Sequence, residues 1–289
     1  MKVARAVSEL ERVPRAVAVG TFDGVHLGHW RVLQAILETG LRATVVTFEP
    51  HPRTVLGNRV ELLATVERRL ELLEVAGVEE TLLVEFTPEL AEREPEEFAE
   101  QLLRPIGADL IAAGENFRFG RGRRGDLELL SGLGFDVRSV PMLEGASSTR
   151  IRQLLGAGEI EAAARLLGRP PEVEGVVVAG DARGGTLGFP TANLRVDPEL
   201  LVPAYGIYAG QTLGHRAAVS IGVNPHYGGT ERRVEAFLLD FDGDLYGTRL
   251  LVELWERLRD ELAFADEAAL VAQIADDVAC ARRARPPAR

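Results

Sequence analysis

A regular alternation of short apolar runs with helix-period segments, from residue 16 to about residue 145, most constrains the fold of this 289-residue chain. The apolar runs are AVAVG, ATVVTF, TLLVEF, ADLIAAG and FDVRSVPML, and the segments between them include HWRVLQAILE, VERRLELLEVAG, PEEFAEQLL and DLELLSGLG. Such an alternation is the sequence form of repeated βαβ units. We therefore predict an α/β region built on a parallel sheet, with ligands bound at the carboxyl ends of its strands.

The pattern changes after LLGRPPEVEG, where Pro170 and Pro171 interrupt a helical stretch. The segments VEGVVVAGD, GIYAGQTLG, HRAAVSIGV, RVEAFLLDF and TRLLVELWERL follow as strands separated by glycine turns. This order is typical of a small antiparallel β-barrel. The final FADEAALVAQIADDVACARRA predicts an amphipathic helix with Asp266 as its N-cap. We expect one domain over residues 1–168 and a second over residues 169–289.

Composition limits the classes of partner. A formal charge of −11 argues against a protein that coats nucleic acid, because phosphate binding there needs a broad basic surface. Cys280 is the only cysteine, which excludes a disulfide within the chain and a multi-cysteine zinc site. The first twenty residues have no long apolar core, and no later stretch is apolar enough to span a bilayer. We expect a cytoplasmic location and no membrane partner.

The stretch AVAVGTFDGVHLGHW places two histidines where a strand would turn into a helix. Gly20 allows a sharp turn, and Gly28 lets the main chain come close to a bound group. Free N–H groups at a helix start bind anions, and His26 and His29 add donors that can stabilise charge during nucleotidyl transfer. A lone His-x-x-His is more often a structural pair in a turn. The flanking residues 22–24, Phe-Asp-Gly, favour the functional interpretation.

GTFDGVHLGH resembles the His-x-Gly-His signature of the nucleotidyltransferase superfamily, in the form found in bacterial bifunctional riboflavin kinase/FAD synthetases. That signature alone would also fit the pantetheine-phosphate or nicotinate-nucleotide enzymes or a class I aminoacyl-tRNA synthetase. The likeness continues through VVTFEPHPRTVL, FTPELAEREPEEFAEQLL, GADLIAAGENFRFGRGRRGDLELL and SSTRIRQLLGAGEIEAAARLLGRP. GENFRFG together with SSTRIR is far more specific. The resemblance implies a Rossmann-like domain that transfers an adenylyl group from ATP to FMN.

The resemblance also implies which residues form the adenylyl-transfer site. His26 and His29 would be catalytic, and Arg152 would be the arginine of the family motif. Ser148 and Thr149 stand where a new helix begins, so they can cap it and offer hydroxyls to a phosphate. The residues expected to bind ATP or its phosphates are Gly20, Phe22, Asp23, His26, His29, Asn116, Ser148, Thr149 and Arg152.

Two features near this site have alternative interpretations. Asp23 either orients a histidine or caps a turn, and the turn is favoured. The arginines of the RFGRGRRG loop, Arg118, Arg121, Arg123 and Arg124, either help to hold anions or form a solvated charge run. The chemistry itself needs no protein nucleophile, because a phosphate oxygen of FMN attacks the α-phosphorus of ATP and pyrophosphate leaves. We expect a magnesium ion on the phosphates, for which the sequence identifies no protein ligand in this half.

GDARGGTLGFPTANL, residues 180–194, combines a glycine-rich stretch with a polar cluster at a strand start. Glycines permit a segment that closes on phosphates. Thr191 and Asn193 are two residues apart, so on an extended segment both point to the same side and can reach a hard cation and a phosphate. An ordinary glycine hairpin is the interpretation that this stretch would favour if it stood alone.

The pattern G-x-L-G-F-P-T-A-N resembles the riboflavin kinase module of the same family, and LVPAYGIYAG, IGVNPHYGG, VEAFLLDFDGDLYG and RLRDELAF follow it. The resemblance implies that Glu235 is the general base that activates the ribityl 5′-hydroxyl of riboflavin. It implies that Thr191 and Asn193 bind Mg2+. The residues expected to bind ATP or flavin in this module are Gly188, Pro190, Thr191, Asn193 and Arg259.

Three residues of this module have a second interpretation. Glu235 is otherwise a polar residue on the wet face of the barrel, and Arg259 otherwise forms an ion pair with Glu261 or Asp260. His226 stands where many bacterial members of the family have the threonine of N-P-T-F, which puts in doubt any contact made by that threonine. No histidine or cysteine is spaced to join His226 in a metal site.

We predict a two-step enzyme that converts riboflavin and ATP to FMN, and FMN and a second ATP to FAD and pyrophosphate. Its partners are then small molecules and Mg2+, and the sequence does not indicate its oligomeric state. One alternative is a chain in which one module has lost activity, and another is a flavin-binding carrier without turnover. A nucleic-acid-binding module is disfavoured, because no stripe of basic and aromatic residues is present.

Overall fold

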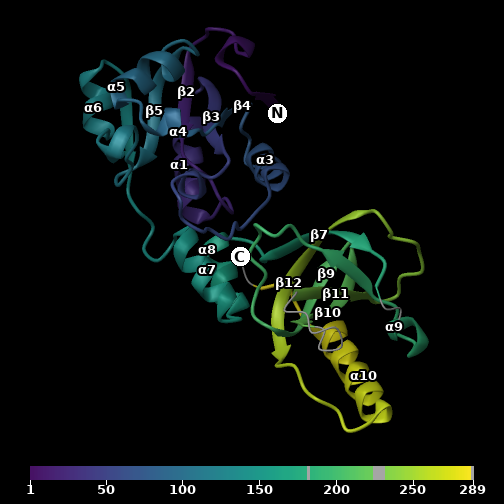
Figure 1. Ribbon diagram of the computed structural model, residues 1–289. Helices are drawn as coiled ribbons and strands as arrows, with labels where there is room; N and C mark the ends of the chain where they lie inside the picture. The colour runs from purple at the N-terminus through teal and green to yellow at the C-terminus, as the bar shows by residue number, and fades with distance from the viewer. Residues whose placement is uncertain (181–182, 224–231, 288–289) are drawn as a thin grey trace. The chain divides into compact units, whose positions relative to one another are not determined.

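The computed structural model describes residues 1–180, 183–223 and 232–287 of the chain. The chain forms two compact units, Met1–Ser147 and Ser148–Arg289, and each is described by itself. The expected domain boundary after residue 168 lies two helices further along the chain than the division between these units, and it stays a prediction. Figure 1 shows the order of the helices and strands.

The first unit is built on a six-stranded sheet in the order β1-β4-β3-β2-β5-β6. Its strands are β1 (Lys2–Ala4), β2 (Arg15–Val19), β3 (Arg42–Glu49), β4 (Glu80–Glu85), β5 (Ala108–Gly114) and β6 (Asp136–Val140). All neighbouring strands pair in parallel. The α/β fold predicted from the apolar runs is therefore confirmed. The edge strand β1 was not anticipated, because three residues are too few to show a pattern.

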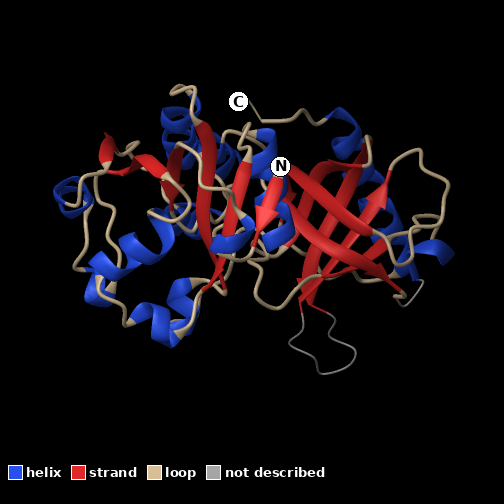
Figure 2. Ribbon diagram, turned by 90° about the horizontal axis from the view of Figure 1, so that it is seen from above, coloured by secondary structure: helices blue, strands red, loops and turns tan. Residues whose placement is uncertain are grey.

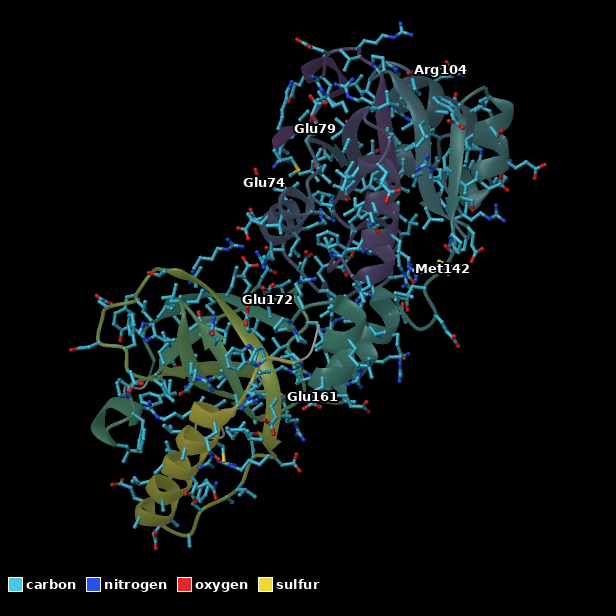
Figure 3. The ribbon with its side chains drawn as sticks, turned by 180° about the vertical axis from the view of Figure 1, so that it is seen from behind. Glu74, Glu79, Arg104, Met142, Glu161 and Glu172 are labelled. Atoms are coloured by element: carbon cyan, nitrogen blue, oxygen red, sulfur yellow. The ribbon has the colours of Figure 1, made fainter. Side chains whose placement is uncertain are left out.

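Helices connect these strands, as the βαβ pattern predicts. They are α1 (Leu27–Leu37), α2 (Pro52–Val55), α3 (Val66–Val75), α4 (Pro88–Ala91), α5 (Pro95–Phe98) and α6 (Leu127–Gly132). Short turns of other helix types are η1 (Val7–Glu9), η2 (Ala99–Leu103), a π-helical continuation of α5, and η3 (Arg121–Arg123). At the end of η2, Arg104 donates to the carbonyl oxygen of Leu133, and its guanidinium carbon lies 4.2 Å from the centre of the Phe135 ring (Figure 3).

Two apolar clusters fill the two faces of the parallel sheet. On β2, Ala16 and Ala18 pack in the cluster that contains residues of α1 and α3. The alternate residues Val17 and Val19 pack in the cluster that contains residues of α4, α5, η2 and α6. A strand covered on both faces is apolar throughout, which is why AVAVG is a continuous apolar run.

A buried ion pair lies at the amino ends of β2 and β4. Arg15 is fully buried, and its Nε and Nη2 donate to Oε2 of Glu80 at 2.9 and 2.7 Å. Its Nη1 also donates to the carbonyl oxygens of Val13, at 3.2 Å, and of Ile106. Arg42 approaches Oε1 of Glu80 at 3.5 Å. This network is at the end of the sheet opposite to the strand ends where ligands bind, so it serves stability.

The second unit contains a closed barrel of six antiparallel strands in the order β10-β11-β8-β7-β12-β9. The strands are β7 (Glu172–Val178), β8 (Ala192–Arg195), β9 (Gly206–Thr212), β10 (His215–Val223), β11 (Arg232–Leu238) and β12 (Arg249–Arg259). Its helices are α7 (Ser148–Gly156), α8 (Ile160–Leu167), α9 (Arg183–Thr186) and α10 (Glu267–Arg283). The predicted antiparallel barrel and terminal helix are confirmed, and Figure 2 distinguishes the strands from the helices.

Helix α10 packs on the outside of the barrel. Asp266 is its N-cap, as predicted, and accepts the N–H of Ala269 at 2.8 Å. At the other end, Arg216 of β10 donates to the main-chain oxygens of Arg282, at 2.8 Å, and of Ala284. These carbonyls would otherwise have no partner within the helix, so Arg216 caps its C-terminus. In the described part of the chain, no helix combines the length and the apolar character needed to cross a membrane.

Candidate active sites

The loop between β2 and α1 has an unusual backbone. Phe22, Gly24 and Val25 have φ angles of 50°, 77° and 38°, in the left-handed region that favours glycine. Phe22 is 2% exposed and Val25 is fully buried, so packing on all sides holds these residues in place. Conformations of this kind cost about 1–3 kcal/mol each and persist where the surroundings impose them, often at functional sites.

The two predicted histidines form one unit at the start of α1. His26 is the N-cap, and its Nδ1 accepts the main-chain N–H of His29 at 3.3 Å. The two imidazole rings stack with their centroids 3.7 Å apart, and the Phe22 ring lies 5.1 Å from that of His29. Because His26 is only 6% exposed, the pair is held in a fixed orientation beside N–H groups that favour an anion.

Glycines keep this region tightly packed. A Cβ atom on Gly28 would lie 3.0 Å from Cε1 of His26 and 3.4 Å from the carbonyl oxygen of Ala146. A Cβ atom on Gly20 would lie 3.2 Å from Cε2 of Phe22. A larger residue at either position would therefore push against the ring of His26 or of Phe22.

Asp23 joins the loop to a distant segment. The side chain is 2% exposed, and its Oδ1 accepts the main-chain N–H of Leu63 at 2.9 Å. A Cβ atom on Gly24 would lie 2.9 Å from Cβ of Leu63, so the segment before α3 packs directly on the loop. This contact was not predictable from the sequence, because the two residues are 40 positions apart.

Asn116 follows the carboxyl end of β5, the strand next to β2. A Cβ atom on Gly114 would lie 3.4 Å from Oδ1 of Asn116 and 3.5 Å from the sulfur of Met142. Met142, labelled in Figure 3, follows the end of β6 and is 43% exposed. The expected site residues Gly20, His26 and Asn116 thus all follow strands that end at the same edge of the parallel sheet, the edge where such sheets bind ligands.

Ser148, Thr149 and Arg152 of the SSTRIR motif lie in the second unit. α7 begins at Ser148, as expected from SSTRIR, and Thr149 and Arg152 are in its first turns. Their association with the two histidines stays a prediction.

The loop arginines pair with carboxylates of their own surroundings. Arg121 lies 3.1 Å from Glu92 and 3.6 Å from Glu94, and Arg124 also pairs with Glu94. Arg118 pairs with Asp126, the N-cap of α6. Because these pairs are exposed and their charges largely offset one another, the geometry favours the solvated charge run over an anion site.

The polar residues predicted in the barrel meet on one face of two neighbouring strands. Glu235 of β11 is the cross-strand partner of Asn193 of β8, and Oγ1 of Thr191 lies 3.2 Å from Oε2 of Glu235. Nδ2 of Asn193 donates to the carbonyl oxygen of Thr191 at 3.4 Å. Ala192 and Leu194, which alternate with them along the chain, are buried. Thr191 and Asn193 therefore point to the same side, as their spacing predicts.

Gly180 and Gly184 of the glycine-rich segment lie against this cluster. A Cβ atom on Gly180 would lie 2.3 Å from Nδ2 of Asn193, and one on Gly184 would lie 3.3 Å from Oγ1 of Thr191. Phe189 packs edge to face on Phe237 of β11, with centroids 5.5 Å apart. Gly188 has a φ of 86°, which explains a glycine there. Pro190 is exposed and leads directly into Thr191.

Arg259 at the end of β12 has a partner that the sequence did not suggest. Its Nε and Nη2 donate to the two carboxylate oxygens of Asp277 on α10, at 2.9 and 2.6 Å. Asp260 accepts from Arg259 through its main-chain oxygen, at 2.8 Å, and its carboxylate pairs with Arg257 instead. The ion pair proposed with Asp260 or Glu261 is therefore not the pair that forms. His226 lies outside the described residues.

Two buried charges near these sites were missed from the sequence. Arg69 of α3 is 5% exposed and Asp277 of α10 is 6% exposed. The available signal was periodicity, because Arg69 lies in register with the buried Leu72, Leu73 and Ala76, on the face of α3 that packs on the sheet. A charged residue in an apolar stripe implies a buried polar partner.

Comparison with known proteins assigns both halves of the chain. The FAD synthetase family matches residues 9–152, and the riboflavin kinase family matches residues 167–285. The chain is 36% identical to the bifunctional riboflavin kinase/FMN adenylyltransferase of Escherichia coli K12, over 98% of this chain and 97% of that protein. The chain belongs to this family. The chain is 35% identical to the Listeria monocytogenes member, over 92% of this chain and 90% of that protein. It is 33% identical to the Bacillus subtilis member, over 92% of this chain and 91% of that protein.

A solved structure has the same architecture over nearly the whole chain. The protein is from Streptococcus pneumoniae and is described as a macrolide-efflux protein. It has a TM-score of 0.88 and 31% identity, and the match covers 97% of this chain and 98% of that one. The family resemblance drawn from the motifs is confirmed, and so is the predicted function: the chain is an enzyme with riboflavin kinase and FMN adenylyltransferase activities, which make FMN and FAD.

Proposed function

We propose that the two reactions occur at two separate sites, with adenylyl transfer at the edge of the parallel sheet and riboflavin phosphorylation on the barrel. The observation that supports this division is that each half of the chain has its own compact polar cluster. His26 and His29 stack at the start of α1, and Thr191, Asn193 and Glu235 meet across β8 and β11. We assign the first site to the domain of residues 1–168 and the second to residues 169–289.

In the proposed kinase step, Glu235 accepts the proton of the ribityl 5′-hydroxyl. The freed oxygen forms a bond to the γ-phosphorus of ATP while the bond to ADP breaks, which yields FMN. A carboxylate on a strand suits this role, because the backbone ladder fixes its position. The hydroxyl of Thr191 lies 3.2 Å from one oxygen of Glu235, so Thr191 can orient the carboxylate while its other oxygen accepts the substrate proton.

The oxygen donors of this cluster also fit a magnesium ion. Thr191 and Asn193 supply a hydroxyl and an amide oxygen, the hard ligands that Mg2+ takes together with water and nucleotide phosphates. When bound, the ion would neutralise phosphate charge during transfer. Gly188 and Pro190 would shape the glycine-rich segment over the nucleotide, and Arg259 would contact flavin.

In the proposed adenylyl transfer, the chain supplies orientation and charge rather than a nucleophile. His26, His29 and the N-terminal end of α1 would face the phosphates of ATP and stabilise the negative charge that moves onto the departing pyrophosphate. Gly20, Phe22 and Asp23 would set the loop, and Asn116 would bind ligand at the neighbouring strand end. Ser148, Thr149 and Arg152 would bind phosphate, a role that rests on the family motif SSTRIR and on the start of α7 at Ser148.

The test is chromatographic. Purified protein is incubated with riboflavin, ATP and Mg2+, and separately with FMN, ATP and Mg2+, and the flavins are separated over time. His29→Ala should lower FAD formation by about 10²–10³-fold and leave FMN formation unchanged, because it removes a donor to transition-state charge. Loss of both activities in a folded His29→Ala protein would contradict separate sites. A wild-type protein that makes FMN but not FAD would show that the adenylyl-transfer site is inactive.

We also propose a cytoplasmic location, with small-molecule substrates and no nucleic-acid partner. The proposal is supported by the substrates of the two reactions and by the negative formal charge of the chain. Fractionation of the source cells, with FAD synthesis as the marker, would test it.

A further inference from the structure

Arg69 connects the two strand ends that border the adenylyl-transfer site. Its Nη1 donates to the carbonyl oxygen of Thr21 at 2.9 Å, and its Nη2 donates to the carbonyl oxygen of Phe48 at 3.0 Å. Thr21 lies in the loop after β2, and Phe48 is the second-to-last residue of the neighbouring strand β3. One guanidinium therefore joins the carboxyl ends of two adjacent strands, at the edge of the sheet where His26 and His29 lie.

Burial of the Arg69 guanidinium carries a desolvation penalty, which its hydrogen bonds and the nearby carboxylates offset. Arg69 is 5% exposed, and burial lowers its pKa, while the carboxylates of Glu49 and Asp23 act in the opposite direction. Glu49 accepts from Nη2 at 3.3 Å. Asp23, within the loop, accepts the N–H of Leu63, so the loop is also tied to the segment before α3.

The loop that Arg69 holds is the strained one. Between Thr21 and His26, the positive φ angles at Phe22, Gly24 and Val25 do not form spontaneously in a mobile segment. The carbonyl of Thr21 accepts a second hydrogen bond, from Oγ1 of the fully buried Thr47 at 3.1 Å. Two donors on one carbonyl fix the direction in which the chain leaves β2.

We infer that Arg69 is a positioning residue for adenylyl transfer, which acts through the carbonyl of Thr21 to orient the His26–His29 pair and does not itself contact substrate. The inference rests on the proposed role of these histidines. A fork of donors is required, since a single ammonium group cannot reproduce the two directed bonds to Thr21 and Phe48. Displacement of a catalytic group by about 1 Å can cost about 10²-fold in rate, so the effect should appear in kcat.

The test compares Arg69→Met with Arg15→Met. Both remove a buried arginine from the same unit, but Arg15 lies at the opposite end of β2, away from the loop. Each protein is assayed for FAD formation, for FMN formation as an internal control, and for its melting temperature, at a temperature well below the lowest melting point. Arg69→Met should lower kcat for FAD formation about 10–100-fold, with a smaller change in KM for FMN. Arg15→Met should lower the melting temperature and leave kcat unchanged.

Two further variants keep the inference testable if Arg69→Met does not fold. Arg69→Lys retains the charge without the fork and should have an intermediate kcat. Thr47→Val removes only the other donor to Thr21 and should lower kcat in the same direction. The inference is overturned if the Arg69 variants lose stability but keep wild-type kcat, or if Arg15→Met lowers kcat as much. If His29→Ala retains full FAD formation, the proposed site itself fails, whatever Arg69 does.

Discussion

The ion pair between Arg15 and Glu80 allows a quantitative prediction about stability. The Arg15 side chain is fully buried and the Glu80 side chain is 7% exposed, so water cannot solvate either charge. Glu80→Gln keeps the shape and one hydrogen-bond acceptor but removes the negative charge. The buried guanidinium then lacks a negatively charged partner. It keeps its hydrogen bonds to the neutral carbonyl oxygens of Val13 and Ile106.

Removal of one partner from a buried ion pair costs about 3–5 kcal/mol, and the remaining carbonyl acceptors favour the lower end, about 3 kcal/mol. For a unit of roughly 150 residues, 1 kcal/mol changes the melting temperature by about 2–4 °C, which gives a decrease of about 6–12 °C. Scanning calorimetry should show this decrease in the transition of the first unit. Riboflavin kinase activity reports whether the barrel is intact in the same samples.

Glu79→Gln is the matched control (Figure 3). Glu79 is the preceding residue, it is exposed, and its Oε1 accepts the N–H of Ala43 at 3.0 Å, a bond that an amide oxygen can also accept. Its effect should stay within about 0.5 kcal/mol. If Glu80→Gln unfolded at the same temperature as Glu79→Gln, Arg15 would not depend on the charge of Glu80, and the reasoning from burial would be wrong.

Three further predictions concern the barrel and one helix cap. Glu235→Ala should lower FMN formation by about 10²–10⁴-fold while FAD is still made from supplied FMN, because only the kinase base is lost; equal loss of both activities in steady-state assays would contradict this. Asp277→Asn should weaken the hold of α10 on Arg259, lowering the barrel's stability by about 2 kcal/mol and raising KM for riboflavin; unchanged values in calorimetry and kinetics would show that the pair is dispensable. The pKa of Asp126 is lowered, chiefly by the N–H of Leu129, so its stabilising effect is present above the usual carboxyl pKa and is lost as pH falls through the lowered one. Asp126→Asn should therefore reduce the loss of unfolding free energy at acid pH, measured by urea titration at several pH values. If the pH dependence were unchanged, the capping bond of Asp126 would not be its cause.

Some of the site could be predicted because its signals are local. Thr191 and Asn193 alternate with buried residues along one short segment, and His26 and His29 follow an apolar run at a helix start, so spacing alone places each pair on one side of the chain. Family motifs then supplied the chemistry. Contacts across the fold were not predictable in this way. The fork of Arg69 and the bond from Asp23 to Leu63 join residues that no local period relates.

The sequence by itself determined the parallel sheet, the barrel and the two reactions, because strand burial and the short motifs are visible within a few neighbouring residues. Only the tertiary structure decided which partners the buried charges take. It paired Arg259 with Asp277 rather than Asp260, and it brought Thr191 to Glu235 across 44 positions. The physical reason is that strand register and helix docking are set by whole apolar faces packing together, and polar side chains then pair with whatever this packing brings within reach.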